Sequence, residues 1–403
     1  MDEKLPLVLY LLTLIPGMYS IDIGTCQAKC SGLPPGSKIV QVSMVYRHGD
    51  RNPISEYPTS IFFNESNWKR GFGQLTKVGE KQQYNFGIWI KDHYGPNGCG
   101  LLPAEYDPRH YKVVSTNLDR TIMSGLANTA GIYPPSYSLV KGLRWKPVPV
   151  RNIEENEYDE TFGQFCPKMT EMLTKLREER FKELQQKNPE LFIYADNYSQ
   201  YGMSTRPERM FWLYDTAYVE YIQKNWLPDW LKPIFPYPLR SYFYEFLRQY
   251  AWTDQLKRLY AGTTLKTIFH TMVNVTLGLD SVKLRAYSAH DTNVFSIMSV
   301  LGLEPAEPPL YTSAVIFELY KTTRSLYFVR LLYRTGPGST PFPLIMPGCG
   351  GCEFCRLETI YKVLKPYFPD NFKEECKTDS PDIANLALDK DAFLEKLVRP
   401  YVC

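Results

Sequence analysis

The chain has 403 residues, of which 44% are hydrophobic and 22% are charged, and its formal net charge is +3. A chain of this length predicts a large globular domain together with a smaller one. The small net charge, with no long run of like charges, gives no support to nucleic-acid or membrane-surface binding. We therefore expect no nucleic-acid partner.

The N-terminal segment is apolar from Leu5 to Ile15 and is broken by Pro16 and Gly17. This pattern is typical of a secretory signal peptide, which we place at residues 1–20 with the cleavage site left open. A buried N-terminal helix or strand is the alternative. No later segment is apolar for long enough to span a bilayer, so we expect no membrane anchor. The expected location is extracellular, with the lysosomal lumen as the alternative.

The first predicted strand covers residues 38–46, a β-branched apolar run that leads directly into the sequence Arg-His-Gly-Asp-Arg at residues 47–51. Five further elements alternate in the same way between strand and helix along the chain. They are a helix at 75–93, a strand at 111–115, a helix at 118–130, a strand at 282–288 and a helix at 293–301. Strands separated by helices predict an α/β fold with a mostly parallel central sheet flanked by helices.

The middle of the chain has few strand signals. Residues 166–188 are charged and amphipathic, and aromatic-rich helical segments follow over 207–274. We interpret residues 161–275 as a smaller α-helical cap inserted into a discontinuous α/β domain, 38–160 and 276–376. Residues 377–403 form a charged C-terminal tail.

Sequons and cysteines fit the expected route of secretion. Three sequons begin at Asn64, Asn197 and Asn274 and predict a glycoprotein. The chain has nine cysteines. Because this number is odd, at least one cysteine is free, removed with the signal peptide or bonded to another chain. Secretion favours disulfides, although the closely spaced Cys349, Cys352 and Cys355 could instead hold zinc. The other cysteines are Cys26, Cys30, Cys99, Cys166, Cys376 and Cys403.

Residues suited to phosphate chemistry follow three predicted strands. Arg47, His48 and Arg51 follow the first, Arg120 follows the strand at 111–115, and His290 and Asp291 follow the strand at 282–288. Alone, the 47–51 loop would be a simple turn. The carboxyl ends of strands in open α/β sheets are where ligands bind, so we expect the three segments to meet.

Each residue type in this set has a chemical property that suits it to phosphate transfer. Arginines bind phosphate through paired donors, and a neutral imidazole at His48 can attack phosphorus. His290 can donate to a phosphate oxygen, and Asp291 can protonate the departing alkoxide. A free Asp titrates near about 4, so an acidic working pH follows.

The surroundings of two of these residues support the same chemistry. We expect Thr116 to cap the helix that carries Arg120, with Asp119 completing a capping box. The neighbouring arginines should lower the pKa of His48 and keep it neutral in acid.

The chain resembles the histidine acid phosphatases, specifically their prostatic and lysosomal branch, from about residue 38 to residue 376. The resemblance rests on residues 47–53, Gly-Phe-Gly-Gln-Leu-Thr at 71–76, Leu-Asp-Arg-Thr at 118–121, Tyr-Ser-Ala-His-Asp-Thr at 287–292 and Met-Pro-Gly-Cys at 346–349. It implies phosphate monoester hydrolysis with His48 as nucleophile and Asp291 as general acid. Phosphate would be bound by Arg47, Arg51, Arg120 and His290, and no metal or organic cofactor is implied.

The resemblance also implies two disulfides, Cys166 with Cys376 and Cys349 with Cys355. Cys352 leaves the second pairing open, and the remaining cysteines have no counterpart. Two positions depart from the family beside the site: Val114 replaces an arginine and Asn117 an aspartate, which bears on substrate preference and rate. Residues 143–151 resemble the family's dimer contact, so a homodimer stays open.

Three functions remain in competition. The first is an acid phosphatase acting on a small phosphomonoester or a phosphoprotein. The second is a phytase or inositol-polyphosphate phosphatase of the same superfamily, and the third is an inactive secreted binding protein on this fold. The full set of site residues disfavours the third.

Overall fold

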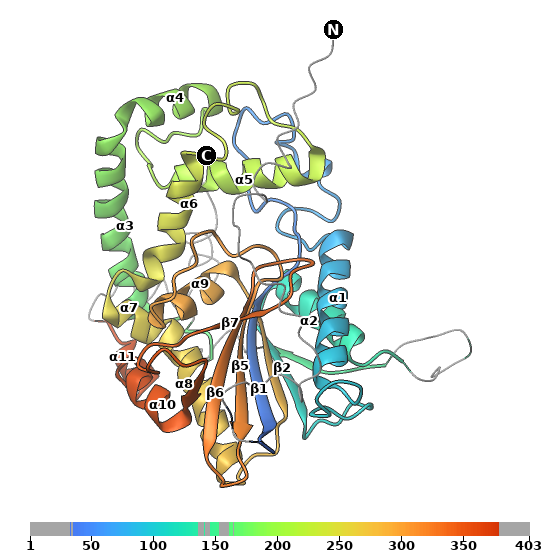
Figure 1. Cartoon of the computed structure of the whole chain (residues 1–403). Coiled ribbons are helices and arrows are strands. Elements are labelled where there is room, and N and C mark those ends of the chain that lie inside the picture. Colours follow the sequence, from blue (N-terminus) through green and yellow to red (C-terminus); the bar gives the residue numbers. More distant parts are fainter. Residues whose placement is uncertain are drawn as a thin grey trace.

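The computed structural model describes residues 33, 35–135, 141, 146–152, 161–163 and 165–378. The predicted signal peptide, most of the tail, and Cys26, Cys30 and Cys403 lie outside these residues. Within them, a central sheet carries helices on both faces, and further helices lie above one end of the sheet (Figure 1). The predicted α/β fold class is confirmed. No helix of the described chain is both long and apolar enough to cross a bilayer.

The sheet has a parallel half and an antiparallel half, in the order β3-β2-β4-β1-β5-β6-β7 with β8 paired to β6. The parallel strands are β3 (Val150–Asn152), β2 (Tyr111–Ser115), β4 (Leu284–Ala289) and β1 (Lys38–Arg47). The antiparallel strands are β5 (Ala314–Lys321), β6 (Tyr327–Arg334), β7 (Phe342–Leu344) and β8 (Phe354–Arg356). The antiparallel half was not among the predicted strands.

The register of the parallel strands sets the position of the site. Tyr46 of β1 lies opposite Ser288 of β4, and Ser115 of β2 lies opposite the same serine. The three strands therefore end at one level. Their carboxyl ends form a single edge, where an α/β sheet presents its ligand-binding loops.

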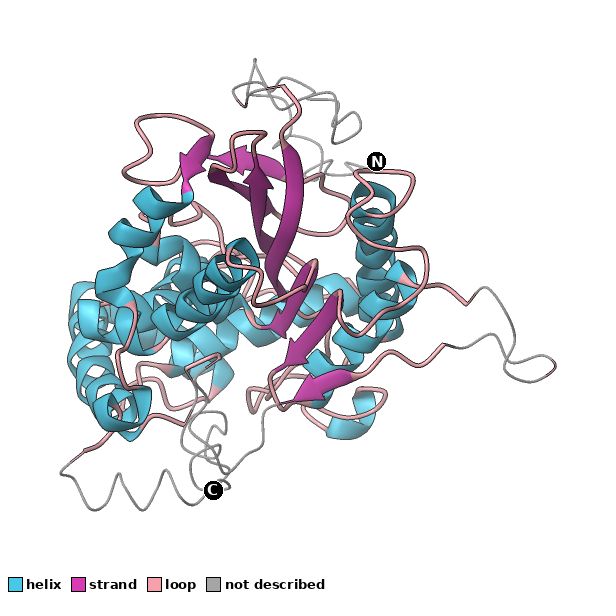
Figure 2. Ribbon diagram, turned by 90° about the horizontal axis from the view of Figure 1, so that it is seen from below, coloured by secondary structure: helices cyan, strands magenta, loops and turns pink. Residues whose placement is uncertain are grey.

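Helices cover the two faces of the sheet (Figure 2). One face packs against α1 (Lys77–Tyr94) and α2 (Asp119–Ile132), and the other against α8 (Ala261–Thr276), α9 (Asp291–Val300) and α10 (Leu357–Leu364). Side chains alternate between the two cores because successive strand residues point to opposite faces. In β1, Val45 enters the core with α8 and α9, whereas Met44 and Tyr46 enter the core with α1 and α2.

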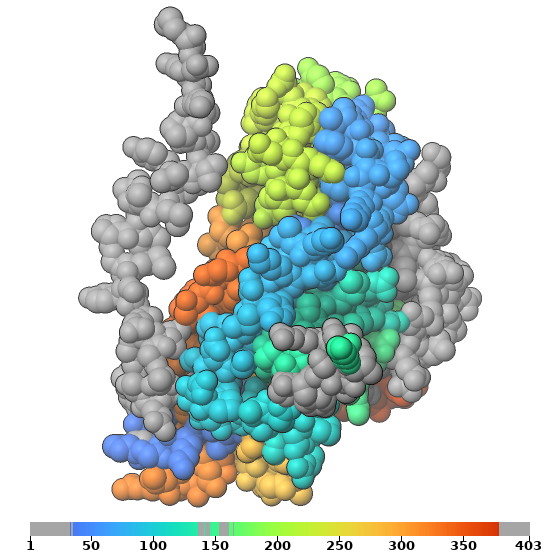
Figure 3. Space-filling view, turned by 90° about the vertical axis from the view of Figure 1, so that its right-hand side faces the viewer, coloured from blue at the N-terminus to red at the C-terminus, as the bar shows by residue number. Residues whose placement is uncertain are grey.

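A helical region lies beyond the edge where the parallel strands end (Figure 1). Its helices are α3 (Pro167–Lys187), α4 (Pro189–Ser199), α5 (Arg209–Lys224), α6 (Leu239–Arg248) and α7 (Asp254–Leu259). An aromatic core of its own includes Phe192, Phe211 and Phe243, and Tyr57 from the loop after β1 joins that core. Figure 3 shows this loop, in blue, packed beside the yellow-green helices. The shorter elements are η1 (Glu65–Asn67), η2 (Gln249–Ala251), η3 (Lys365–Tyr367) and α11 (Phe372–Glu375).

Both disulfides implied by the resemblance are present. Cys166 and Cys376 join the start of α3 to the end of α11, and Cys349 and Cys355 close a short loop. The zinc alternative for this cluster is wrong, because two of its three sulfurs are in a disulfide; Cys352 is free and exposed. Cys99 is also disulfide-bonded. No group of potential metal ligands occurs among the described residues.

Candidate active site

The loop after β1 is fixed by its neighbours at the strand ends. The amide of His48 donates to the carbonyl of Ala289 at 3.0 Å, and its carbonyl accepts from the amide of Thr312 at 3.1 Å. A β-carbon on Gly49 would lie 2.3 Å from the carbonyl oxygen of Gly79, so only glycine allows this approach to α1. These contacts bury His48, leaving 2% of it exposed.

Asp50 anchors the loop to the start of α1. Its carboxylate accepts from the hydroxyl of Thr76, the N-cap of α1, at 2.5 Å and from the amide of Gln223 at 3.1 Å. Its backbone amide donates to Gln82 at 2.9 Å. Burial raises the pKa of Asp50. With these partners, Asp50 holds the loop in place.

The tautomer of His48 follows from one hydrogen bond. Its Nδ1 lies 2.8 Å from the carbonyl oxygen of Gly49. A carbonyl can only accept, so Nδ1 carries the proton and Nε2 keeps its lone pair. Burial lowers the pKa of His48 well below its usual value, and the charges of Arg120, Arg47 and Arg51 lower it further. The neutral form that a nucleophile requires is therefore favoured.

The three predicted arginines lie around this imidazole, and each has an N–H donor that is not used within the described residues. Arg47 donates from Nη1 to the carbonyl of Pro309 at 2.7 Å and lies over the ring of Tyr311 at 4.4 Å. Arg51 donates from Nη2 to both carboxylate oxygens of Asp215, at 2.9 and 3.1 Å. The Nε atoms of Arg47, Arg51 and Arg120 are all buried and find no hydrogen-bond partner in the described part of the chain. These three donors are open to a bound acceptor, although the Nε atoms of Arg209, Arg285 and Arg330 are also buried and unpartnered in the described part of the chain.

Arg120 is the least neutralised of the three. It stands in the first turn of α2, and burial followed by the charge of Arg51 lowers its pKa to about 9. The guanidinium still carries its charge in acid or at neutral pH. A bound anion would relieve the repulsion between these two arginines.

His290 precedes α9 and faces His48, with 5.6 Å between the ring centroids. Its Nε2 lies 2.9 Å from the hydroxyl of Thr116, which lies 2.8 Å from that of Thr121. The predicted capping role of Thr116 is wrong: the N-cap of α2 is Leu118, which makes no side-chain capping bond. The hydroxyl of Thr116 contacts His290 and Thr121 instead, so the capping box with Asp119 does not form.

Asp291 is the first residue of α9 and is 14% exposed. Its Oδ2 lies 2.8 Å from Nη2 of Arg47, and its Oδ1 accepts from the amide of Thr292 at 2.8 Å. It thus contacts one of the predicted arginines and directly follows His290 in the chain. This position suits a group that exchanges protons with a leaving group.

Sequence reasoning missed two contributors to the site, Asp215 and Tyr311. Asp215 stands on α5, more than 160 residues from Arg51 in sequence, and Tyr311 precedes β5. Each is a single residue in an aromatic segment. No local sequence pattern distinguishes either residue, so only a comparison of related sequences could have identified them.

The two departures from the family lie in β2 and in the segment that follows it. Val114 is half-buried against the core, and Asn117 accepts from the amide of Asn152 at 2.7 Å. The segment that resembles a dimer contact lies mostly outside the described residues. Of the predicted glycosylation residues, Asn64, Asn197 and Asn274 are all exposed.

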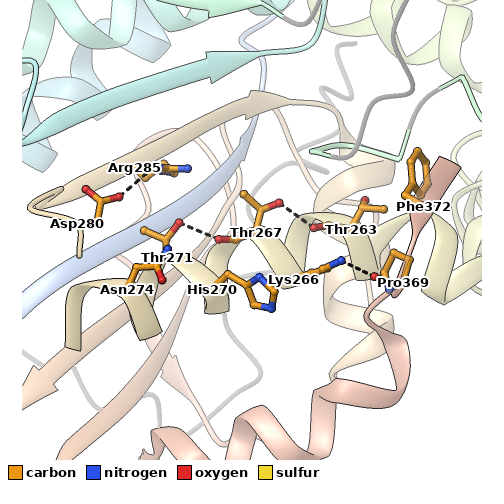
Figure 4. A pocket seen from close by; sticks show the side chains of 10 residues that line it. All are labelled: Thr263, Lys266, Thr267, His270, Thr271, Asn274, Asp280, Arg285, Pro369 and Phe372. Carbon is orange, nitrogen blue, oxygen red and sulfur yellow. Dashed lines mark hydrogen bonds and ion pairs between the residues drawn. The ribbon is translucent and has the colours of Figure 1, made fainter. Parts of the chain in front are cut away.

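The remaining histidines lie outside the site. His93 stacks on Trp89, His110 lies near Asp107, and His270 lies 3.3 Å from the hydroxyl of Tyr361. His270 lines a pocket of about 270 Å³ beside α8. Figure 4 shows the side chains that line it, among which Lys266 donates to the backbone carbonyl of Pro369. None of the predicted phosphate ligands lines this pocket.

Comparisons with known proteins agree on one family. The model for the histidine phosphatase superfamily (branch 2) matches residues 38–334. Lysosomal acid phosphatase of Xenopus laevis is 32% identical over 84% of this chain and 79% of its own length. Prostatic acid phosphatase of Rattus norvegicus is 31% identical over 92% and 98%.

Solved structures show the same fold. The apo phytase of Hafnia alvei superposes with a TM-score of 0.62 at 16% identity, covering 86% of this chain and 99% of that one. The phytase of Citrobacter braakii gives 0.60 at 15% identity, over 86% and 100%. Together with the match of the family model, these findings place the chain in branch 2 of the histidine phosphatase superfamily.

Proposed function

We propose that the protein is an acid phosphatase that hydrolyses phosphate monoesters through a phosphohistidine on His48. The observation that carries the proposal is that three arginines, Arg47, Arg51 and Arg120, lie around His48, whose hydrogen bond through Nδ1 leaves the lone pair on Nε2. A phosphate group supplies acceptor oxygens and negative charge where both are missing. Phosphoryl transfer depends chiefly on such positioning and charge stabilisation.

In the first step, Nε2 of His48 attacks phosphorus and the bond to the ester oxygen breaks. Asp291, in its protonated form, gives its proton to that oxygen, and the alcohol leaves. The arginines stabilise the charge on the three phosphoryl oxygens. His290 donates from Nε2, exchanging its contact with Thr116 for a phosphate oxygen.

In the second step, water attacks the phosphorus of the phosphohistidine. The Asp291 carboxylate takes the proton of the attacking water, and the bond from phosphorus to Nε2 breaks. Inorganic phosphate then leaves, and His48 returns to its neutral form. Because burial and the arginines lower the pKa of His48, it is a better leaving group than an ordinary imidazole.

The acid phosphatase relatives favour this reaction over phytate hydrolysis. They are about 30% identical over most of the chain, whereas the phytase structures are 15–16% identical and show the fold alone. The inactive-binding-protein alternative would require loss of at least one site residue, and all six predicted ones are present. We further propose residues 161–275 as a cap over this site, and secretion or lysosomal delivery as for the named lysosomal relatives.

The test is a substrate panel on the purified protein. We expect p-nitrophenyl phosphate and simple phosphomonoesters to be hydrolysed in acid, because Asp291 acts as the proton donor. Phytate should be a much poorer substrate. Faster turnover of phytate would favour the phytase alternative, and no turnover of any phosphomonoester would favour the binding protein.

A further inference from the structure

A second group of buried ionisable residues lies between the loop that follows β1 and helix α5. Glu56 of the loop and Glu220 of α5 are adjacent, and they are 6% and 0% exposed. We call this boundary between residues 52–70 and α5 the cap seam. The cap seam contains none of the residues proposed to react with the substrate. It does join the loop that contains Arg51 to α5.

The two carboxylates differ in their hydrogen bonds. Glu220 accepts from the hydroxyl of Tyr57 at 3.1 Å and from the hydroxyl of Ser60. Both oxygens of Glu56 are buried, and neither has a hydrogen bond of ordinary geometry within the described residues. A carboxylate can only accept, so two ionised carboxylates cannot bond to each other. A proton on Glu56 turns it into a donor for its neighbour.

The groups that face the pair do not neutralise it. From the loop these are Tyr57, Ser60 and Trp68, and from the segment before α5 it is Tyr201. Lys224 of α5 lies over the Trp68 ring at 4.5 Å and donates to the carbonyl of Asn67. Burial raises the pKa of both carboxyls, and the charge of Glu220 raises that of Glu56 further.

Hydrogen bonds along the same cap seam also hold the loop that contains Arg51. The hydroxyl of Thr216 donates to the carbonyl of Ser55 at 2.7 Å, and Gln223 donates to the carbonyl of Arg51 at 2.8 Å. Asp215, on the same helix, accepts from the Arg51 guanidinium. Movement of α5 away from the loop would therefore release Arg51 at its backbone and at its side chain.

We propose that Glu56 and Glu220 share one proton in the working enzyme, and that this proton keeps α5 docked so that Asp215 positions Arg51 for phosphate. Glu56 and Glu220 are thus positioning residues, and they act through α5. Loss of the proton places two like charges together in a buried seam, which favours separation. The affinity for phosphate then depends on the protonation of this pair. This dependence is separate from the need for a proton on Asp291.

The sign of the effect on stability follows from the raised pKa values. An unfolded glutamate loses its proton near about pH 4.3, whereas the folded pair keeps its shared proton to higher pH. The stabilisation is fully present below that value and is lost as the pH rises through the folded values. Stability should therefore fall as the pH rises from about 4.3.

The test compares the wild-type protein with Glu56→Gln, which keeps the shape and supplies an amide donor that does not ionise. Glu179→Gln, at an exposed position on α3, is the matched control. Tm is measured across pH without substrate, so this arm does not depend on the proposed reaction. We expect the fall in Tm between about pH 5 and about pH 8 to be smaller in Glu56→Gln than in the other two proteins. The same fall in all three would overturn the proposal.

A second arm measures inhibition by inorganic phosphate, and it rests on the proposed function. The ratio of variant to wild-type affinity cancels the titration of phosphate itself. We expect the alkaline loss of affinity in Glu56→Gln to move up by at least one pH unit, about tenfold at a fixed alkaline pH. An unchanged ratio across pH would contradict the link to Arg51.

Infrared spectroscopy of the wild-type protein keeps the proposal testable if Glu56→Gln fails to fold. A protonated buried carboxyl gives a carbonyl stretch distinct from that of a carboxylate, and we expect it to persist at neutral pH. Its loss in Glu220→Gln or Glu56→Gln assigns it to the pair. Absence of such a band at neutral pH in the wild-type protein would overturn the proposal.

Discussion

Arg47 and Asp291 form a nearly buried ion pair, with 2.8 Å between Nη2 and Oδ2, that joins the end of β1 to the start of α9. A proposed phosphate ligand and the proposed general acid are thus in contact before substrate arrives. In the proposed reaction, a bound phosphate group would offer Arg47 a second anionic partner, with the ester oxygen toward Asp291. Phosphate binding and proton delivery would then be linked through this one guanidinium.

Replacing Asp291 with Ala should slow the hydrolysis of alkyl phosphates far more than that of aryl phosphates. An alkoxide needs a proton to leave, whereas p-nitrophenolate leaves without one, and general acids contribute about 10²- to 10⁴-fold. The measurement is kcat for a series of leaving groups. Equal slowing across the series would remove Asp291 from the role of acid.

Arg120→Ala should weaken inhibition by inorganic phosphate about ten- to hundredfold, because one charge-assisted hydrogen bond contributes about 1.5 to 3 kcal/mol. Arg109→Ala removes an exposed arginine that pairs with Asp107 and is the control. The measurement is the competitive inhibition constant of inorganic phosphate for each variant. Equal constants for the two variants would show that Arg120 does not bind phosphate.

The same Arg120 variant should change the dependence of activity on pH. Removing a positive charge from beside His48 raises the pKa of that imidazole, so protonation begins to inactivate it at higher pH. The acid limb of kcat/KM should move up in pH relative to the wild-type enzyme. A limb that moves down, or stays in place, would argue against the assigned electrostatics.

His48→Asn should reduce the loss of stability in acid. The pKa of folded His48 lies well below its usual value, so below about pH 6.5 the unfolded chain binds a proton that the folded protein does not. Wild-type Tm should fall more steeply than that of the variant as the pH drops below about 6.5. Parallel curves would mean that His48 is not held neutral.

Asp215→Asn should raise KM and lower stability, because it leaves the guanidinium of Arg51 buried without its counter-charge, at a cost of about 3 to 5 kcal/mol. Asp229→Asn, at an exposed residue, is the control. Added phosphate should recover part of the Tm of the Asp215 variant, since it supplies a new counter-ion. No recovery would indicate that Arg51 does not face the phosphate site.

Local sequence pattern was sufficient for the strands that build the site and not for all of its contacts. The runs that form β1, β2 and β4 are buried, apolar and followed at once by polar residues, so their common edge could be predicted. The antiparallel partners β5 and β6 lie between the motifs at 287–292 and 346–349 and were not predicted. Their pairing depends on long-range contacts.

Thr116 and Asp215 show the physical limit of such reasoning. Thr116 has the spacing of a helix cap, yet its hydroxyl contacts His290, 174 residues away in sequence. Asp215 contacts Arg51 only because α5 packs against the loop after β1. Neither local spacing nor residue type reports which distant element supplies the partner of a buried polar group.

Trapping the phosphorylated enzyme tests directly whether His48 is the nucleophile. The enzyme is mixed with a radiolabelled phosphomonoester, quenched in alkali and mapped by peptide. We expect an acid-labile, alkali-stable label on His48, and we expect both the label and turnover to be absent from His48→Ala. A label on another residue, or an unimpaired rate in His48→Ala, would contradict this assignment.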